Sequence, residues 1–124
     1  MMDEEQGTEL KGLLEDFLSG TKGMKGTLVC TRDGLLTCGV GALNDPDALA
    51  AILSSAIGIG QHAAEHSSLG AFSETILKAE EGFLAVVAIG DSHVLGAVCS
   101  HHNTMGMVVL KARRTAQRIK NEVQ

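Results

Sequence analysis

Two glycines in the middle of the chain have the spacing of a nucleotide-binding motif. Gly58, Gly60 and Ala63 match the G-x-G-x-x-G/A pattern, in which the glycines let the backbone approach the pyrophosphate of a dinucleotide. That chemistry requires a strand before the first glycine and a helix that begins there. Residues 48–57 are instead rich in Ala, Leu and Ser and already have a helical pattern. We therefore interpret the glycines as sites of close helix packing, and a nucleotide-binding enzyme is the least favoured of three functional classes.

Two histidines follow the glycines on the same predicted helix. His62 and His66 are four residues apart, a spacing that lets two imidazoles share a metal ion. Glu65 lies between them, but the order is not the H-E-x-x-H of metalloproteases. We interpret the pair as polar surface near the helix end and expect no metal.

A Cys-Ser-His-His sequence at positions 99–102 contains both metal ligands and a possible Cys/His nucleophilic pair. Nothing in the sequence orients one of these groups against another, and only Cys30 or another histidine brought close by the fold would complete a site. G-x-S-x-G and P-loop patterns do not occur. We therefore expect a protein without catalytic residues and without a cofactor.

The other two cysteines flank a predicted hairpin. Residues 26–31 and 36–40 are rich in strand-forming types, and Asp33-Gly34 between them is a strong turn signal. A two-residue loop at this point pairs Cys30 with Thr37 and Cys38 with Val29. Because neighbouring residues of a strand point to opposite faces, Cys30 and Cys38 should form neither a disulfide nor a metal pair.

The composition limits the class of protein. The 124 residues are 44% apolar and suit a single domain, residues 1–124. Three Phe with no Trp or Tyr, together with a net charge of −5, argue against nucleic-acid binding. The first residues are acidic, unlike a signal peptide, and no apolar run reaches the roughly 18 residues of a membrane span. We expect a cytoplasmic protein with reduced thiols.

Hydrophobic periodicity predicts the element order α-β-β-α-β-β-β-α. A first helix at 4–19 has an apolar stripe and an acidic outer face, and a last helix at 104–122, capped by Asn103 or Thr104, has a basic outer face. Asn44 or Asp45 can cap a central helix at 46–66, and three strands at 71–79, 83–89 and 93–99 have turns so short that neighbours must be antiparallel. We interpret the two charged faces as solvated, although the basic one could meet an acidic partner or a membrane surface.

The central helix is the most informative element because residues 48–60 carry no charge. One stripe suits contact with a sheet and comprises Leu49, Ile52, Leu53, Ala56, Gly60 and Ala63. A second stripe is small and almost uncharged and comprises Ala51, Ser55, Gly58 and His62. The solvent face of a monomer would normally carry Lys or Glu at such positions, whereas small residues let a second helix approach closely. We expect this second stripe to form a twofold dimer contact.

The strand that follows the central helix carries Glu74, Lys78 and Glu80, a pattern consistent with an edge strand. Edge strands with open backbone groups can pair across a dimer. We therefore predict one interface made of the second helical stripe and of Phe72, Glu74 and Ile76 on this strand.

These features together resemble the Roadblock/dynein light chain family, which includes Mgl B-type regulators of bacterial gliding motility and archaeal relatives. The resemblance covers residues 10–119. It depends on the element order, the 26–40 hairpin with Asp33-Gly34 at its tip, the Ala-rich helix after Asp45-Pro46, the Gly82-Phe83-Leu84 strand start, the Gly90-Asp91 turn and the closing 113–119 segment, RRTAQRI.

The resemblance implies an α/β (α+β) fold of the Roadblock/profilin-like type, a five-stranded antiparallel sheet with the central helix on one face and the terminal helices on the other. It implies homodimers in which the central helices pack together and the third strands join the two sheets. Family members have no catalytic residues of their own and regulate Ras-like small GTPases or act as scaffolds. We therefore expect a homodimer that binds such a GTPase and modulates its nucleotide cycle. The alternative is a passive scaffold or dynein-type light chain that binds a peptide or another Roadblock-like chain.

Overall fold

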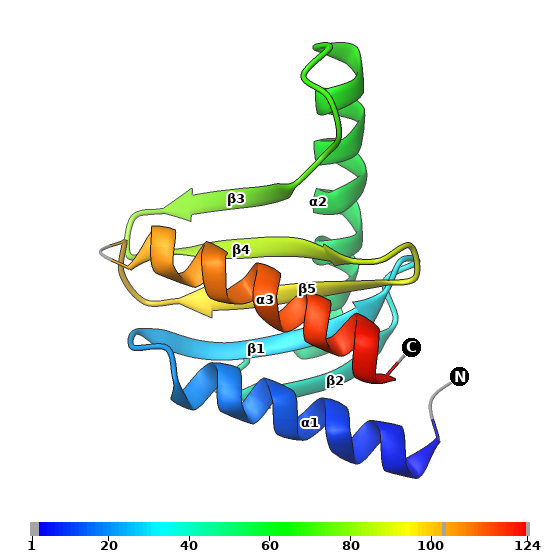
Figure 1. Cartoon of the computed structure of the whole chain (residues 1–124). Helices are drawn as coiled ribbons and strands as arrows, with labels where there is room; N and C mark the ends of the chain where they lie inside the picture. Colours follow the sequence, from blue (N-terminus) through cyan, green and yellow to red (C-terminus); the bar gives the residue numbers. More distant parts are fainter. Residues whose placement is uncertain (1–2, 103, 124) are drawn as a thin grey trace.

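The computed structural model describes residues 3–102 and 104–123 (Figure 1). Their elements follow the predicted order α-β-β-α-β-β-β-α. The bounds are α1 (Glu4–Ser19), β1 (Met24–Thr31), β2 (Leu36–Gly41), α2 (Pro46–His66), β3 (Glu74–Ala79), β4 (Gly82–Ile89), β5 (His93–Cys99) and α3 (Met105–Val123).

The five strands form one antiparallel sheet in the order β2-β1-β5-β4-β3. Helices α1 and α3 cover one face and α2 covers the other, as Figure 1 shows. The prediction of a five-stranded antiparallel sheet between helices is therefore confirmed. β3 is an edge strand, also as predicted, and its outer backbone has no neighbour within the described part of the chain.

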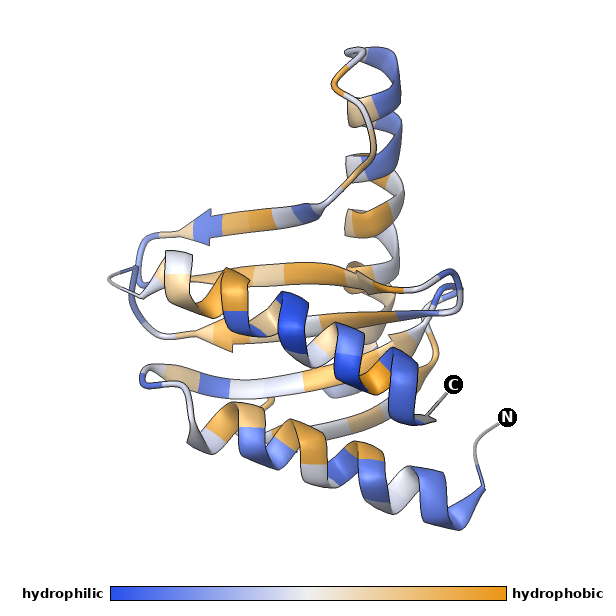
Figure 2. Cartoon of the chain, in the orientation of Figure 1, coloured by the Kyte–Doolittle hydropathy of each residue, from blue (hydrophilic) through white to orange (hydrophobic). Residues whose placement is uncertain are grey.

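Strand alternation divides the core between the two faces of the sheet. Val29 packs toward α1 and α3, whereas Leu28 and Cys30 on either side of it pack toward α2. Figure 2 shows the corresponding pattern, with β4 largely hydrophobic and α1 and α3 alternating between hydrophobic and hydrophilic turns. Four residues of α2 are buried, namely Ala50, Leu53, Ala56 and Ile57.

Side-chain caps set the helix starts. The Asp3 carboxylate accepts a hydrogen bond from the backbone N–H of Gln6 at 2.8 Å, and the Gln6 side-chain oxygen accepts one from the backbone N–H of Asp3. Asp45, rather than Asn44, caps α2 by accepting from Ala48 N–H at 3.2 Å. Helices α1 and α2 have the predicted bounds, whereas α3 begins one residue later than predicted. Asn103, a candidate cap of α3, lies outside the described residues.

The register of the first hairpin differs from the prediction at one residue. Val29 pairs with Cys38 as expected, but a bulge between Val29 and Cys30 pairs Cys30 with Leu36, so the expected pairing of Cys30 with Thr37 is wrong. The loop spans residues 32–35 rather than two residues, and Gly34 has a φ of 91° that favours glycine. Cys30 still packs toward α2 and Cys38 toward α1 and α3, so the two thiols stay on opposite faces as predicted.

β3 begins at Glu74, three residues later than the predicted start at Ala71. The end of α2 stands beyond the edge of the sheet, and the chain must return from there before it can pair with β4 (Figure 1). Phe72 lies on this return path and packs against the α2 core instead of entering the sheet. Tertiary packing therefore overrides the strand pattern of residues 71–73.

Candidate functional site: the open face of α2 and the β3 edge

The face that α2 presents to the sheet is rotated from the prediction. Ile52 was expected to face the sheet but is 49% exposed, while Ala50 and Ile57 are buried in its place. Ala63, also expected to face the sheet, is exposed. It belongs to the last part of α2, and that end of the helix stands beyond the sheet (Figure 1). Leu53, Ala56, Leu49 and Gly60 do lie on the sheet side, fully or half buried.

The opposite face of α2 is open and uncharged. Ala51, Ser55 and His62 are exposed and Gly58 is half buried, so all four lie on an accessible side of the helix. Two large apolar side chains flank them, Ile52 and Ile59, the latter 70% exposed. We call these six residues the open α2 face. An isolated domain would leave an apolar surface here, which is the mark of an interaction site.

Glycine at position 58 makes this face flat. A Cβ added to Gly58 would meet no atom of the described structure within 4 Å. Packing within its own chain therefore does not require a glycine at this position. The Ser55 hydroxyl donates to the Ala51 carbonyl at 3.2 Å and so needs no outside partner. Gly60 differs, because a Cβ there would stand 2.5 Å from Thr75 Oγ1 and closer still to Phe72.

The three strand residues predicted for the interface have other contacts as well. Arg113 of α3 donates to the Glu74 carboxylate through Nε at 2.7 Å and through a second, shorter contact. Ile76 packs toward α1 and α3, and Phe72 packs toward α2. All three side chains are half buried. The free outer backbone of β3, rather than these side chains, is what the edge offers to another strand.

A row of apolar side chains beside α2 was not predicted. Leu77, Leu84 and Val98 are direct neighbours across β3, β4 and β5, on the face that α2 covers. Leu77 is 46% exposed, and the other two are half buried. The Thr75 hydroxyl near the start of β3 donates to the Ala56 carbonyl of α2, whereas Leu77 toward the other end of the strand is exposed. An apolar residue at position 77 of an edge strand was the signal available in the sequence.

The histidines occupy structural positions. His66 Nδ1 lies 2.9 Å from the His62 carbonyl oxygen, and the two rings are 6.2 Å apart. His102 Nε2 lies 2.9 Å from the Ala79 carbonyl oxygen and 2.8 Å from that of Gly82, which ties the β3–β4 turn to the segment before α3. Within residues 3–102 and 104–123, no three His, Cys, Asp or Glu side chains gather in a way that would hold a metal ion.

The thiols are poorly suited to nucleophilic chemistry. Cys99 is 3% exposed and Cys30 is fully buried, and burial raises the pKa of each thiol to about 11. A thiol in this range stays protonated at neutral pH, and the thiolate is the reactive form. The glycine motif is likewise inside α2, with helix rather than strand before it. In the described part of the chain, no helix combines the length and apolar character that a bilayer crossing requires.

Comparisons with known proteins agree with this geometry. The Roadblock/LC7 domain model matches residues 10–99. The uncharacterized protein MJ1340 of Methanocaldococcus jannaschii is 26% identical over 104 residues, which cover 83% of this chain and 90% of that protein.

Solved structures share the fold. MglB with tetrameric arrangement superposes with a TM-score of 0.88 at 23% identity, covering 99% of this chain and 93% of that one. Myxococcus xanthus MglB gives 0.82 at 18% identity, covering 98% and 92%. Profilin II of Acanthamoeba castellanii gives 0.65 at 13% identity over 90% and 97%, which confirms the profilin-like character of the fold.

Proposed function

The chain belongs to the Roadblock/LC7 domain family, and we propose that it is a non-catalytic homodimeric regulator or adaptor that binds a Ras-like small GTPase and modulates its nucleotide cycle. The observation that carries this proposal is the open α2 face, which is uncharged and lies next to a free sheet edge. The proposal treats residues 1–124 as one Roadblock domain acting in the cytoplasm.

A second copy of this chain suits the exposed surfaces. Antiparallel pairing of two β3 edges would satisfy their free backbone groups and join two sheets into one. The twofold relation of such a pair would place the partner's α2 over the other end of β3, where Leu77 is exposed and Leu84 and Val98 are half buried. The end of α2 that stands beyond one sheet would then lie on the sheet of the partner (Figure 1).

The same arrangement explains the residue types of the open α2 face. Two α2 helices side by side bury Ile52 and Ile59, and Gly58 lets the helix backbones approach closely. Burying an Ile side chain is worth about 1.5–3 kcal/mol, so the exposed 70% of Ile59 represents roughly 1–2 kcal/mol in each protomer. A charge at this place would cost more than that on burial, which accounts for the absence of Lys and Glu.

Regulation of a GTPase follows from docking rather than from chemistry on this chain. The two α2 helices of the dimer form a composite surface against which the mobile switch segments of a Ras-like GTPase can rest. A surface that binds one switch conformation more tightly than the other shifts the population toward it, and the rate of nucleotide hydrolysis or release changes accordingly. The protonated, buried thiols of Cys30 and Cys99 favour no reaction carried out by this chain itself.

The test uses the Ras-like GTPase encoded nearest to this chain in its genome, loaded with GDP or with a non-hydrolysable GTP analogue. We expect binding that depends on the nucleotide and a changed rate of GTP hydrolysis. The variant Gly58→Glu should lose both effects. Gly12→Glu is the matched control, because Gly12 lies exposed on α1 and a Cβ there also meets nothing within 4 Å among the described atoms. Equal binding of both nucleotide states with unchanged hydrolysis would leave only an adaptor role.

A further inference from the structure

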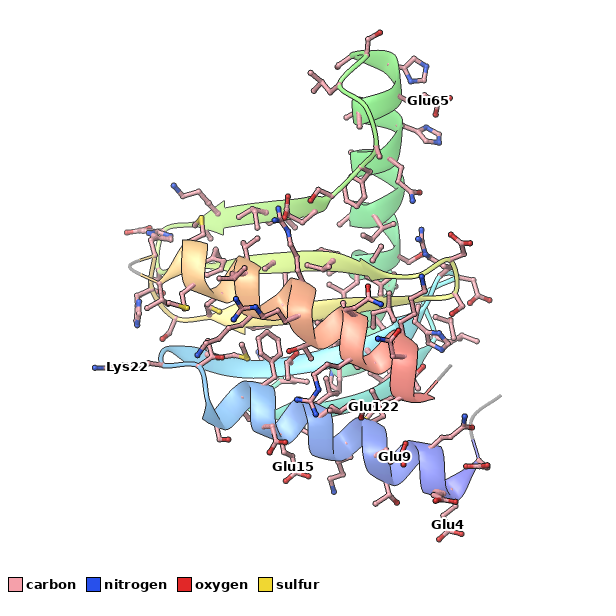
Figure 3. All side chains as sticks on the ribbon, in the orientation of Figure 1. Glu4, Glu9, Glu15, Lys22, Glu65 and Glu122 are labelled. Carbon is pink, nitrogen blue, oxygen red and sulfur yellow. The ribbon has the colours of Figure 1, made fainter. Side chains whose placement is uncertain are left out.

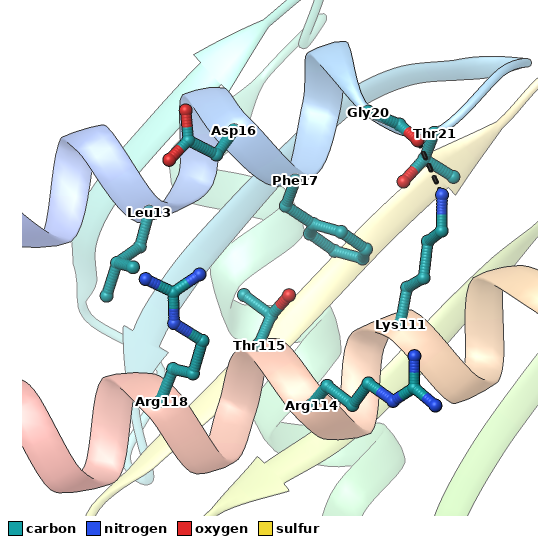
Figure 4. Close-up of a pocket in the computed structure, with 9 residues that line it drawn as sticks. All are labelled: Leu13, Asp16, Phe17, Gly20, Thr21, Lys111, Arg114, Thr115 and Arg118. Carbon is teal, nitrogen blue, oxygen red and sulfur yellow. Dashed lines mark hydrogen bonds between the residues drawn. The ribbon is translucent and has the colours of Figure 1, made fainter.

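A groove runs between α1 and α3, on the face of the sheet opposite α2 (Figure 4). It has a volume of about 280 Å³ and is open to solvent. Leu13 and Phe17 of α1 form its floor, and both are buried. Residues 20 and 21 close one end, and the side chains of α3 form the opposite wall. Nothing in the proposed dimer or GTPase contact uses this groove.

The wall from α3 is positively charged. Lys111, Arg114 and Arg118 line the groove, and Asp16 is the acidic residue among its lining residues, so three positive charges face one negative charge. This concentration of positive charge contrasts with the net charge of −5 on the whole chain. The groove is therefore a local cationic site on an acidic protein.

Two of these three cations have no ion pair among the described residues. Lys111 Nζ donates to the Gly20 carbonyl oxygen at 2.5 Å, a neutral acceptor. Arg118 forms an exposed ion pair with Glu122 of its own helix at 3.7 Å. Within the described residues Arg114 forms no ion pair. Arg113, which is next to Arg114 in the sequence, differs because its guanidinium is paired with the Glu74 carboxylate.

An unpaired hydroxyl in the groove is a second, independent observation. Thr21 lines the groove and is only 4% exposed, and its Oγ1 atom has no hydrogen-bond partner among the described residues. Figure 4 shows this oxygen turned toward the space between Phe17 and Lys111. A buried hydroxyl without a partner is unfavourable, and a small rotation of the Thr21 side chain would let an acceptor group placed in the groove satisfy it.

We propose that the α1–α3 groove binds an extended acidic peptide segment of a partner protein. Lys111 and Arg118 are seven residues apart, which is about 10 Å along a helix and matches about three residues of an extended chain. Carboxylates along that segment pair with the three cations in turn, and one of its acceptors accepts a hydrogen bond from the Thr21 hydroxyl. The guanidinium groups of Arg114 and Arg118 point in different directions in Figure 4, so they suit distributed charges better than a single phosphate.

The surroundings of the groove favour a narrow ligand over a flat anionic surface. Helix α1 exposes Glu4, Glu5, Glu9, Glu15 and Asp16. Figure 3 shows Glu4 and Glu15 on the outer side of α1, away from the sheet. A membrane or a nucleic-acid duplex that approached α3 would also meet this acidic helix and be repelled. A single extended chain reaches the cations without that contact.

The test titrates the peptide acetyl-Glu-Glu-Glu-amide into the ¹⁵N-labelled full chain and follows amide chemical shifts. We expect shifts concentrated at Gly20, Thr21 and Thr115, and binding that weakens as salt is raised. Arg114→Gln should weaken binding about threefold, and the double variant R114Q/R118Q about tenfold, as expected for exposed ion pairs. Thr21→Val, which keeps the side-chain shape, should also weaken it.

Lys120→Gln is the matched control, since Lys120 lies on the same helix, carries the same charge and does not line the groove. Its binding should equal that of the parent. An equal loss in K120Q, or shifts spread over the whole surface, would overturn the site. Inorganic phosphate producing the same shifts at the same concentration would reduce the site to a simple anion site. Vesicles containing phosphatidylserine that bind in place of the peptide would overturn the choice of ligand.

This inference is separable from the proposed function. Gly58→Glu should abolish the dimer and GTPase effects while leaving peptide binding unchanged, because the groove and the open α2 face lie on opposite faces of the sheet. Loss of peptide binding in Gly58→Glu would therefore contradict the groove as a site within one chain.

Discussion

Two glycines in the same helix should respond to the same substitution in opposite ways. Replacing a helix glycine by alanine stabilises a helix by about 1 kcal/mol, because alanine loses less conformational freedom on folding. At Gly58 the new Cβ meets nothing within 4 Å among the described atoms, so Gly58→Ala should raise the free energy of unfolding of an isolated chain by about that amount. The effect is small but measurable by urea denaturation.

At Gly60 the same Cβ would stand 2.5 Å from Thr75 Oγ1 and even closer to the Phe72 ring. Thr75 bonds the Ala56 carbonyl, and Phe72 is packed against the α2 core, so neither can move freely. Overpacking of this kind costs about 1–3 kcal/mol, which outweighs the gain in helix propensity. Gly60→Ala should therefore lower the free energy of unfolding, and the two variants should differ by about 1–3 kcal/mol.

Protein concentration adds a test of the interface. If Gly58 lies against a partner helix, the gain from Gly58→Ala should appear at about 0.1 µM protein, and should shrink or reverse at about 100 µM, where dimers dominate. Gly60→Ala should destabilise at both concentrations, because its clash is within one chain. If Gly58→Ala lowered the free energy of unfolding at the lower concentration, this would refute the conclusion that position 58 is unobstructed in an isolated chain. An unchanged gain at the higher concentration would refute close helix contact at this residue.

Three further predictions concern stability. Thr21→Val should raise the free energy of unfolding by about 1 kcal/mol in a urea titration, because it removes a buried hydroxyl that has no hydrogen-bond partner among the described residues. A decrease of similar size would show that the hydroxyl does have a partner. Asp45→Ala should lower it by about 1 kcal/mol, because the first turn of α2 loses its cap; an unchanged urea midpoint would contradict that role. Burial raises the pKa of Cys30 and Cys99 from 9.0 to about 11. The stability that each neutral thiol contributes is therefore present below pH 9 and is lost as the pH rises toward 11. The loss in the free energy of unfolding should be on the order of 2 kcal/mol for each thiol. The urea midpoint should fall between pH 8 and about pH 10.5, and less so in a Cys99→Ala variant; an equal fall in parent and variant would exclude the thiol as the cause.

Local signals in the sequence were sufficient for most of the architecture. Asp3 and Asp45 cap helices whose apolar spacing already fixed their bounds, and the short turns after β3 and β4 permit only antiparallel neighbours. The uncharged run along residues 48–60 indicated an open helix face, and the structure places Ala51, Ser55 and Gly58 there. The contact itself stays a prediction.

The errors share a physical cause, which is that tertiary geometry decides orientation. Periodicity alone could not tell whether Ile52 or Ile57 faces the sheet, since the two lie on different sides of the same apolar helix. The late start of β3 at Glu74 depends on how far α2 reaches beyond the sheet edge. The groove at Thr21 forms where α1 and α3, which are distant in sequence, lie side by side. Leu77 is exposed because no other element of the described structure covers it.

The mass of the protein in solution tests the central claim most directly. At about 10 µM, sedimentation or light scattering should give the parent chain twice its 12.9 kDa, a concentration at which a stable interface is occupied. Gly58→Glu should give 12.9 kDa with an intact circular dichroism spectrum, while Gly12→Glu should stay at twice that mass. A parent chain of 12.9 kDa at this concentration, or a Gly58→Glu variant that remains dimeric, would contradict the account.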